Sequence, residues 1–139
     1  MNDLIIQEAM TWVDTPYHHL ARCKGVGVDC AQLMAGIAEN LSSKKINIET
    51  YSVEWHLHNR KELMCETLES FGCIQIPLEE AQPGDIITFK FGRVNSHLGL
   101  LLENEQFVHA RMDVGRVVVN TLSGDWKARL GRAYKFPPL

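Results

Sequence analysis

The spacing of apolar residues changes at Pro83-Gly84-Asp85, and this change constrains the fold more than any other feature of the sequence. Before it, apolar residues recur every three or four positions, which is typical of helices with one buried face. After it, apolar and polar residues alternate in short runs, which is typical of antiparallel strands. We therefore expect an α+β fold with N-terminal helices packed on one face of a C-terminal antiparallel β-sheet.

Three helices are expected before the change in pattern. The first spans residues 3–13 and cannot continue through Pro16, which lacks a backbone N–H. A third spans roughly residues 60–70, with Gly72 as its C-terminal stop. Between them, a helix over residues 30–41 would bury one face made of Leu33, Met34, Ile37, Ala38 and Leu41.

The strands are expected to form a meander. One alternating strand follows the turn, and residues 96–122 read as three strands joined by turns at 103–106 and 113–115. Residues 131–139 form the last strand. The segment 42–59 fits no element, and the sequence leaves open whether it covers a groove. The connections are otherwise short, which favours one domain over the whole chain.

Composition sets further limits. The chain has 139 residues, of which 45% are hydrophobic and 22% charged, so residues 1–139 suit a single compact domain. The net charge of −3 argues against a nucleic-acid partner, because proteins that bind nucleic acids usually have a basic face. No stretch approaches the length of a membrane span, and the first residues lack the pattern of a signal peptide. We expect a protein that is cytoplasmic as synthesised and has no membrane partner.

Cys30 stands where a glycine-containing loop becomes a helix. Unpaired N–H groups and the positive end of the helix dipole favour a thiolate there and can bind an oxyanion. Cys30 is therefore the candidate nucleophile, the alternative being a small buried residue of the core. The other cysteines, Cys23, Cys65 and Cys73, have no base nearby in sequence, and we expect reduced thiols.

His97 and His109 are the candidate bases for such a thiol. They lie on consecutive expected strands, on either side of a turn centred near residue 103. Residues facing each other in a hairpin are equidistant from its turn, so the two imidazoles should lie side by side. His97 would then be the base and His109 the group that orients it.

The segments "TPYHHLARCKGVGVDCAQLM", "QPGDIITFKF", "SHLGLLLENEQFVHA" and "GRVVV" resemble the NlpC family of papain-like cysteine peptidases. The resemblance runs from about Trp12 to Tyr134 and is closest to a branch found in phage tails and gene transfer agents. It implies that Cys30 is the nucleophile, His97 the base and His109 its orienting residue. Tyr17 would assist the oxyanion or the substrate amide.

The resemblance also implies the reaction. Members hydrolyse peptidoglycan stem peptides, typically at the γ-D-glutamyl–diamino-acid bond, through a thioester and without a cofactor or metal. Phage-tail proteins are expected partners, and the virion tail would carry the enzyme to the cell wall. Expected substrate-binding residues are Asp29, His18, His19 and Ser96. Cell-wall members usually read "DCSG" where this chain reads "DCAQ", so Ala31 replaces a serine that contacts substrate.

Other interpretations are open. A zinc site could use His18, His19 and Cys23, or the pair His56 and His58, but loop histidines are the simpler explanation because no second tight ligand pair is present. The same scaffold could serve an acyltransferase or transglutaminase-like enzyme, in which an amine outcompetes water at the thioester. A non-catalytic tail-assembly or binding component would not need all of the candidate catalytic residues.

Overall fold

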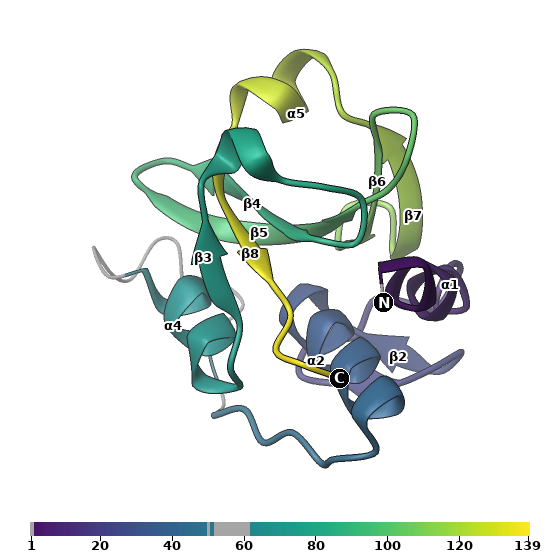
Figure 1. Cartoon of the computed structure of the whole chain (residues 1–139). Coiled ribbons are helices and arrows are strands. Elements are labelled where there is room, and N and C mark those ends of the chain that lie inside the picture. Colours follow the sequence, from purple (N-terminus) through teal and green to yellow (C-terminus); the bar gives the residue numbers. More distant parts are fainter. Residues whose placement is uncertain (1, 50, 52–61) are drawn as a thin grey trace.

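The computed structural model describes residues 2–49, 51 and 62–139. Helices cover one face of an antiparallel sheet, as the sequence predicts (Figure 1). The helices of this layer are α1 (Asn2–Met10), α2 (Cys30–Ser42) and α4 (Leu63–Ser70). No helix of the described ranges is long and apolar enough to cross a membrane.

The first helix is shorter than predicted. Helix α1 ends at Met10, and residues 11–14 continue as turns that close with Asp14 at a φ of 72°. This turn directs the chain toward the sheet, where the Asp14 N–H donates to the Val117 carbonyl at 2.9 Å. The third predicted helix begins at Leu63, and its predicted residues 60 and 61 lie outside the described residues.

In the described part of the chain, the sheet has six strands in the order β3-β8-β4-β5-β6-β7. All pairs are antiparallel, and the predicted meander from β4 to β7 is confirmed. The final strand is inserted between β3 and β4. The bounds are β3 (Ile74–Ile76), β4 (Ile86–Phe91), β5 (Val94–Leu101), β6 (Gln106–Arg111), β7 (Arg116–Thr121) and β8 (Leu130–Lys135).

The shortest elements of the structure were not predicted from the sequence. They include β1 (Arg22–Cys23) and β2 (Gly27–Val28), which pair with each other, the single turn η1 (Leu78–Glu80), and α5 (Gly124–Ala128). Five or fewer residues are too short to show a periodicity. Trp126 of α5 packs on the sheet face that the N-terminal helices leave uncovered, against a second apolar cluster of Ile87, Phe89, Phe107 and Ala133.

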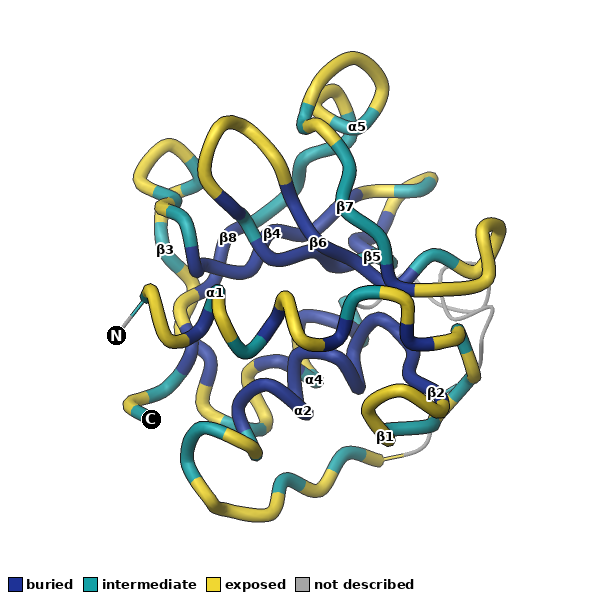
Figure 2. Tube along the Cα trace, turned by 90° about the vertical axis from the view of Figure 1, so that its right-hand side faces the viewer, coloured by how far each residue is buried: buried dark blue, intermediate teal, exposed yellow. Residues whose placement is uncertain are grey.

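Helix α2 is the centre of the main core (Figure 2). Every residue from Cys30 to Ala38 is buried, so the helix is enclosed on all sides over its first turns. Gly36 makes this possible on one side, since a Cβ atom there would lie 2.6 Å from the Trp12 ring. The start of α2 therefore has a fixed position relative to the sheet.

The predicted register of the β5–β6 hairpin is wrong by two residues. Leu100 pairs with Val108 and Leu101 with Phe107, so that continuing this register places Gly99, not His97, opposite His109. The cause is the loop, in which Asn104 and Glu105 both adopt left-handed backbone angles and the centre shifts toward residue 104. A shift of two residues keeps each side chain on its face. The two histidines are therefore diagonal neighbours on one face of the sheet.

Candidate active site

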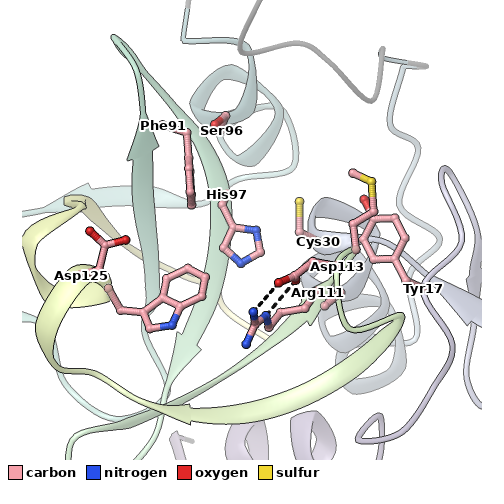
Figure 3. A pocket seen from close by; sticks show the side chains of 11 residues that line it. Tyr17, Cys30, Phe91, Ser96, His97, Arg111, Asp113 and Asp125 are labelled. Atoms are coloured by element: carbon pink, nitrogen blue, oxygen red, sulfur yellow. Dashed lines mark hydrogen bonds and ion pairs between the residues drawn. The ribbon is translucent and has the colours of Figure 1, made fainter.

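A cavity of about 690 Å³ opens between the start of α2, the strands β5 and β6, and α5 (Figure 3). It brings together Cys30, His97 and Tyr17, which lie far apart in the sequence. In Figure 3 the His97 ring and the Cys30 side chain lie next to each other. The lining residues are Tyr17, Cys30, Phe91, Ser96, His97, Ala110, Arg111, Met112, Asp113, Asp125 and Trp126.

Cys30 is the first residue of α2, and Asp29 is its N-cap. The Asp29 Oδ1 atom accepts a hydrogen bond from the Gln32 N–H at 2.9 Å, which satisfies one of the free donors of the first turn. Its Oδ2 atom accepts from the Leu20 N–H at 2.8 Å, and the Tyr51 hydroxyl lies 2.6 Å from both oxygens. Asp29 thus fixes the helix start to the preceding loop.

His97 and His109 form a direct hydrogen bond, so the two rings lie side by side, as the sequence predicts, despite the shifted register. The distance between Nε2 of His97 and Nδ1 of His109 is 2.7 Å. The other nitrogen of His109, Nε2, lies 2.6 Å from Oδ1 of Asn120 on β7. This bond uses one nitrogen of His97 and leaves Nδ1 for the cavity. Both Cys30 and His97 are described residues, and no hydrogen bond joins them.

Aromatic side chains surround the histidine pair. The Trp126 ring lies 4.9 Å from that of His109 and 5.7 Å from that of His97, measured between ring centres. Phe107 and Phe89 pack against the same two rings from the sheet. This burial lowers the pKa of both histidines below the ordinary value of 6.5, and the nearby Arg111 guanidinium acts in the same direction. The pair is therefore neutral at pH 7.

The predicted lowering of the Cys30 pKa is opposed by burial. Removal of the thiol from water raises the pKa of Cys30, and the adjacent Asp29 carboxylate raises this pKa further. Hydrogen bonds from backbone N–H groups at Cys30, Ala31 and Leu98 act in the opposite direction and are outweighed. We therefore expect a neutral thiol beside a neutral imidazole, rather than the thiolate that the position of Cys30 at a helix start predicted.

Tyr17 lies at the cavity, where the sequence analysis placed it. Its N–H donates to the Gly115 carbonyl at 2.8 Å, and it forms a bridge with Val28 of β2. Burial, together with the negative charges that Cys30 and Asp29 can carry, raises the pKa of Tyr17. The phenol therefore remains protonated and can donate a hydrogen bond into the cavity.

The four predicted substrate-binding residues occupy different places. Ser96 lines the cavity. Asp29 is 1% exposed, and its carboxylate accepts hydrogen bonds from groups of this chain, such as the Gln32 N–H. His19 lies beside it, with Nδ1 3.6 Å from the Asp29 carboxylate and Nε2 2.9 Å from the Tyr51 carbonyl. His18 is exposed and is not among the residues that line the cavity.

Sequence reasoning missed Asn120, Arg111 and Trp126. Arg111 could have been found, because it stands two residues after His109 on the same strand and so shares its face. Its Nη1 atom lies 3.4 Å from Oδ1 of Asn120, and its Nε atom donates to Asp113 at 3.0 Å. Asn120 required the β6–β7 register, in which it faces Phe107.

No group of three or more histidine, cysteine, aspartate or glutamate side chains is placed to hold a metal ion in the described ranges. His56 and His58, one of the alternative zinc pairs, lie outside the described residues. All four cysteines are free, with Cys23 exposed and the others buried.

Comparison with known proteins identifies the family. The sequence model of the NlpC/P60 family matches residues 14–134, which is most of the chain and includes every cavity residue. The chain belongs to the NlpC/P60 family. No curated protein sequence matches it.

Solved structures share the fold of this NlpC/P60 domain. An NLP/P60 family protein similar to a lipoprotein, from Staphylococcus aureus, matches with a TM-score of 0.69 and 21% identity over 99% of the chain. The chain spans 42% of that protein. The NlpC/P60 domain of the peptidoglycan hydrolase SagA matches with a TM-score of 0.66 and 18% identity, covering 98% of this chain and 99% of that domain.

A third match is the peptidoglycan hydrolase RipB from Mycobacterium tuberculosis, with a TM-score of 0.62 and 19% identity. It covers 96% of this chain and 63% of RipB. At these identities the likeness establishes the fold. The structure thus confirms the predicted α+β, NlpC-type architecture.

Proposed function

We propose that the chain is a cysteine peptidase that hydrolyses peptidoglycan stem peptides through a thioester on Cys30. The observation that carries this proposal is the placement of Cys30, at a capped helix start, in one cavity with His97, which is hydrogen-bonded to His109. Two structural neighbours are described as peptidoglycan hydrolases, which supports the substrate class. The bond proposed is the γ-D-glutamyl–diamino-acid amide.

The first half of the reaction forms the thioester. Nδ1 of His97 takes the thiol proton as Cys30 attacks the amide carbon, so charge develops only when substrate is present. Backbone N–H groups at the start of α2 and the Tyr17 hydroxyl stabilise the oxyanion. His97 then gives its proton to the leaving amine, and the amine departs.

The second half releases the acid. Water, deprotonated by the now neutral His97, attacks the thioester carbon, and the Cys30 thiol leaves with the proton that His97 returns. An amine acceptor in place of water would make the enzyme an acyltransferase. We propose hydrolysis, with delivery to the wall by a phage tail after synthesis in the cytoplasm.

The test is digestion of purified stem peptides, with mass analysis of the fragments in ¹⁸O-labelled water. We expect one new amine and one carboxylate carrying the label, whereas transfer would join the acyl group to an added amine. Cys30→Ser and His97→Ala should each lose activity by about 10³-fold or more. Cys73→Ser is the matched control, since Cys73 is a buried cysteine outside the cavity.

Failure of the folded wild-type protein to cleave any stem peptide would overturn the proposed substrate. Equal activity in wild type and Cys30→Ser would overturn the mechanism as well. A folded protein that binds stem peptides without cleaving them would instead support the binding-component interpretation.

A further inference from the structure

We infer that Asn120 is a positioning residue that sets the tautomer of His97 through His109, so that Nδ1 of His97 carries a lone pair toward Cys30. The inference rests on the proposed function and deepens its account of the base. Its evidence is a continuous chain of hydrogen bonds from Arg111 through Asn120 and His109 to His97.

The orientation of the Asn120 amide comes from Arg111. A guanidinium has only N–H donors, so the Asn120 atom that faces it must be the oxygen. The distance between Nη1 of Arg111 and Oδ1 of Asn120 is 3.4 Å. Arg111 is itself held by Asp113, which accepts from its Nε and Nη2 atoms.

The proton positions of both histidines follow from this oxygen. Oδ1 of Asn120 only accepts, so Nε2 of His109 must carry a proton and donate to it. A neutral ring has one proton, so Nδ1 of His109 is an acceptor. Nε2 of His97 must then be the donor of the bond between the rings. The remaining nitrogen of His97, Nδ1, is unprotonated and able to accept the thiol proton.

Burial of the His109 ring leaves Asn120 as the acceptor of its Nε2 proton. His109 is fully buried, with 0% of its surface exposed, and the rings of Phe107 and Trp126 pack against it. A buried N–H without an acceptor is unfavourable, so a ring that loses Asn120 gains by moving its proton to Nδ1. The proton of His97 would then move to Nδ1 as well, which blocks its action as a base.

Other groups near the two rings also carry charge or titrate. Arg111 lowers the pKa of both rings and Asp113 raises it. The remaining groups line the same cavity from other elements: Cys30 from α2, Tyr17 from the segment before β1, and Asp125 from α5. None of these lies within hydrogen-bond distance of Nε2 of His109, whose partner is Asn120.

The test compares Asn120→Leu and Asn120→Asp with the wild type. Nitrogen-15 NMR of the imidazoles reports the tautomers directly, and the rate of Cys30 alkylation against pH reports the base. Thr121→Ala is the matched control, since Thr121 is the exposed neighbour on the same strand and points to the opposite face.

In the wild type we expect both rings protonated at Nε2. In Asn120→Leu we expect His109 and His97 to gain the Nδ1-protonated form and alkylation at pH 7 to fall about 10–100-fold, as when other orienting partners are removed. Asn120→Asp keeps an acceptor and should restore alkylation at high pH. Its negative charge raises the pKa of His109. The acid limb of the alkylation profile, which is the fall in rate as the base becomes protonated, should therefore move to higher pH.

An Nδ1-protonated His97 in the wild type would overturn the inference. Unchanged tautomers and alkylation in a folded Asn120→Leu protein would do the same. If Asn120→Leu does not fold, the wild-type tautomers and the acid limb of Asn120→Asp still decide. Both readouts work without stem peptide, so a protein that shows the expected tautomers but cleaves nothing contradicts the proposed function alone.

Discussion

A Cβ atom on Gly131 would lie 1.7 Å from Oδ1 of Asn95, so the backbone of β8 touches the Asn95 amide directly. Asn95 is buried and is held on its other side by Glu62, whose Oε2 atom accepts from the Asn95 N and Nδ2 atoms at 2.9 and 3.0 Å. Thr88 donates to Oδ1 of Asn95 at 2.7 Å. Because Asn95 stands two residues before His97, this contact fixes β5 where it enters the cavity.

Gly131→Ala should therefore disturb stability and reactivity together. The new methyl group must displace the Asn95 amide, which breaks its hydrogen bonds and shifts β5. We expect the free energy of unfolding, measured in urea, to fall by about 1–3 kcal/mol. Alkylation of Cys30 at pH 7 should also slow. A double-mutant cycle with Asn95→Ala is the control. Gly131→Ala should lower the free energy of unfolding less in a protein that already lacks the Asn95 amide. Strictly additive effects would contradict the contact.

Asp29→Asn should make Cys30 more acidic while it destabilises the fold. The Asp29 carboxylate raises the pKa of the thiol, so its neutralisation should lower that pKa. The asparagine side chain keeps one oxygen that can accept a hydrogen bond at the start of α2, but its nitrogen cannot accept. Some present partners of Asp29 therefore lose their acceptor, which should lower the free energy of unfolding by about 1–3 kcal/mol. Thiolate absorbance against pH and urea unfolding measure the two effects.

Asp125→Asn is the control for this experiment. Asp125 also lines the cavity, but its side chain is 82% exposed, so its charge is screened by water. An unchanged thiol pKa in Asp29→Asn, or an equal change in Asp125→Asn, would contradict the role given to Asp29.

The histidine pair should make the protein sensitive to mild acid. Both rings have a lowered pKa in the folded state, whereas an unfolded chain binds their protons below about pH 6.5. The free energy of unfolding should thus fall as the pH decreases from about 6.5, by up to about 1.4 kcal/mol per pH unit for each ring. Urea unfolding between pH 7 and 5 measures this slope, because most carboxylates titrate at a lower pH than this range.

His109→Gln provides the comparison, since glutamine can still hydrogen-bond but does not titrate in this range. We expect a shallower slope in this variant. The same slope as in the wild type would mean that other groups cause the acid sensitivity.

Trp126→Ala should move the acid limb of Cys30 alkylation upward. Removal of the indole admits water to both rings, which relieves the desolvation that lowers their pKa. The base would then be protonated at higher pH, and the limb should approach the ordinary value of about 6.5. Trp126→Phe keeps an aromatic cover and should shift the limb less. Equal profiles in all three proteins would show that Trp126 does not control the pKa of the pair.

The residues of the site that could be predicted share a local signature. Cys30 stands at a visible boundary between loop and helix, and His97 and His109 stand on strongly alternating strands. Their common face followed from the period of two, which survives a register error of two residues. The exact register of β5 and β6 could not be predicted in this way, because it depends on the left-handed backbone angles of Asn104 and Glu105 in the loop.

Asn120 and Trp126 could not be assigned from the sequence for different reasons. Asn120 is an ordinary polar residue of a strand until the β6–β7 register brings it to His109. Trp126 stands in a helix of five residues, where no periodicity can develop. The fold was predictable from long patterned segments, whereas the environment that makes the histidines neutral depends on tertiary contacts.

The position of β8 has a consequence for biosynthesis. Residues 130–135 form the last strand along the chain, yet they lie between β3 and β4 and pair with both. A nascent chain that has emerged only as far as β7 lacks the strand that joins these two parts of the sheet and whose Gly131 contacts Asn95. We therefore expect the candidate active site to assemble only after translation has passed residue 135, so that a nascent chain still lacking β8 is inactive.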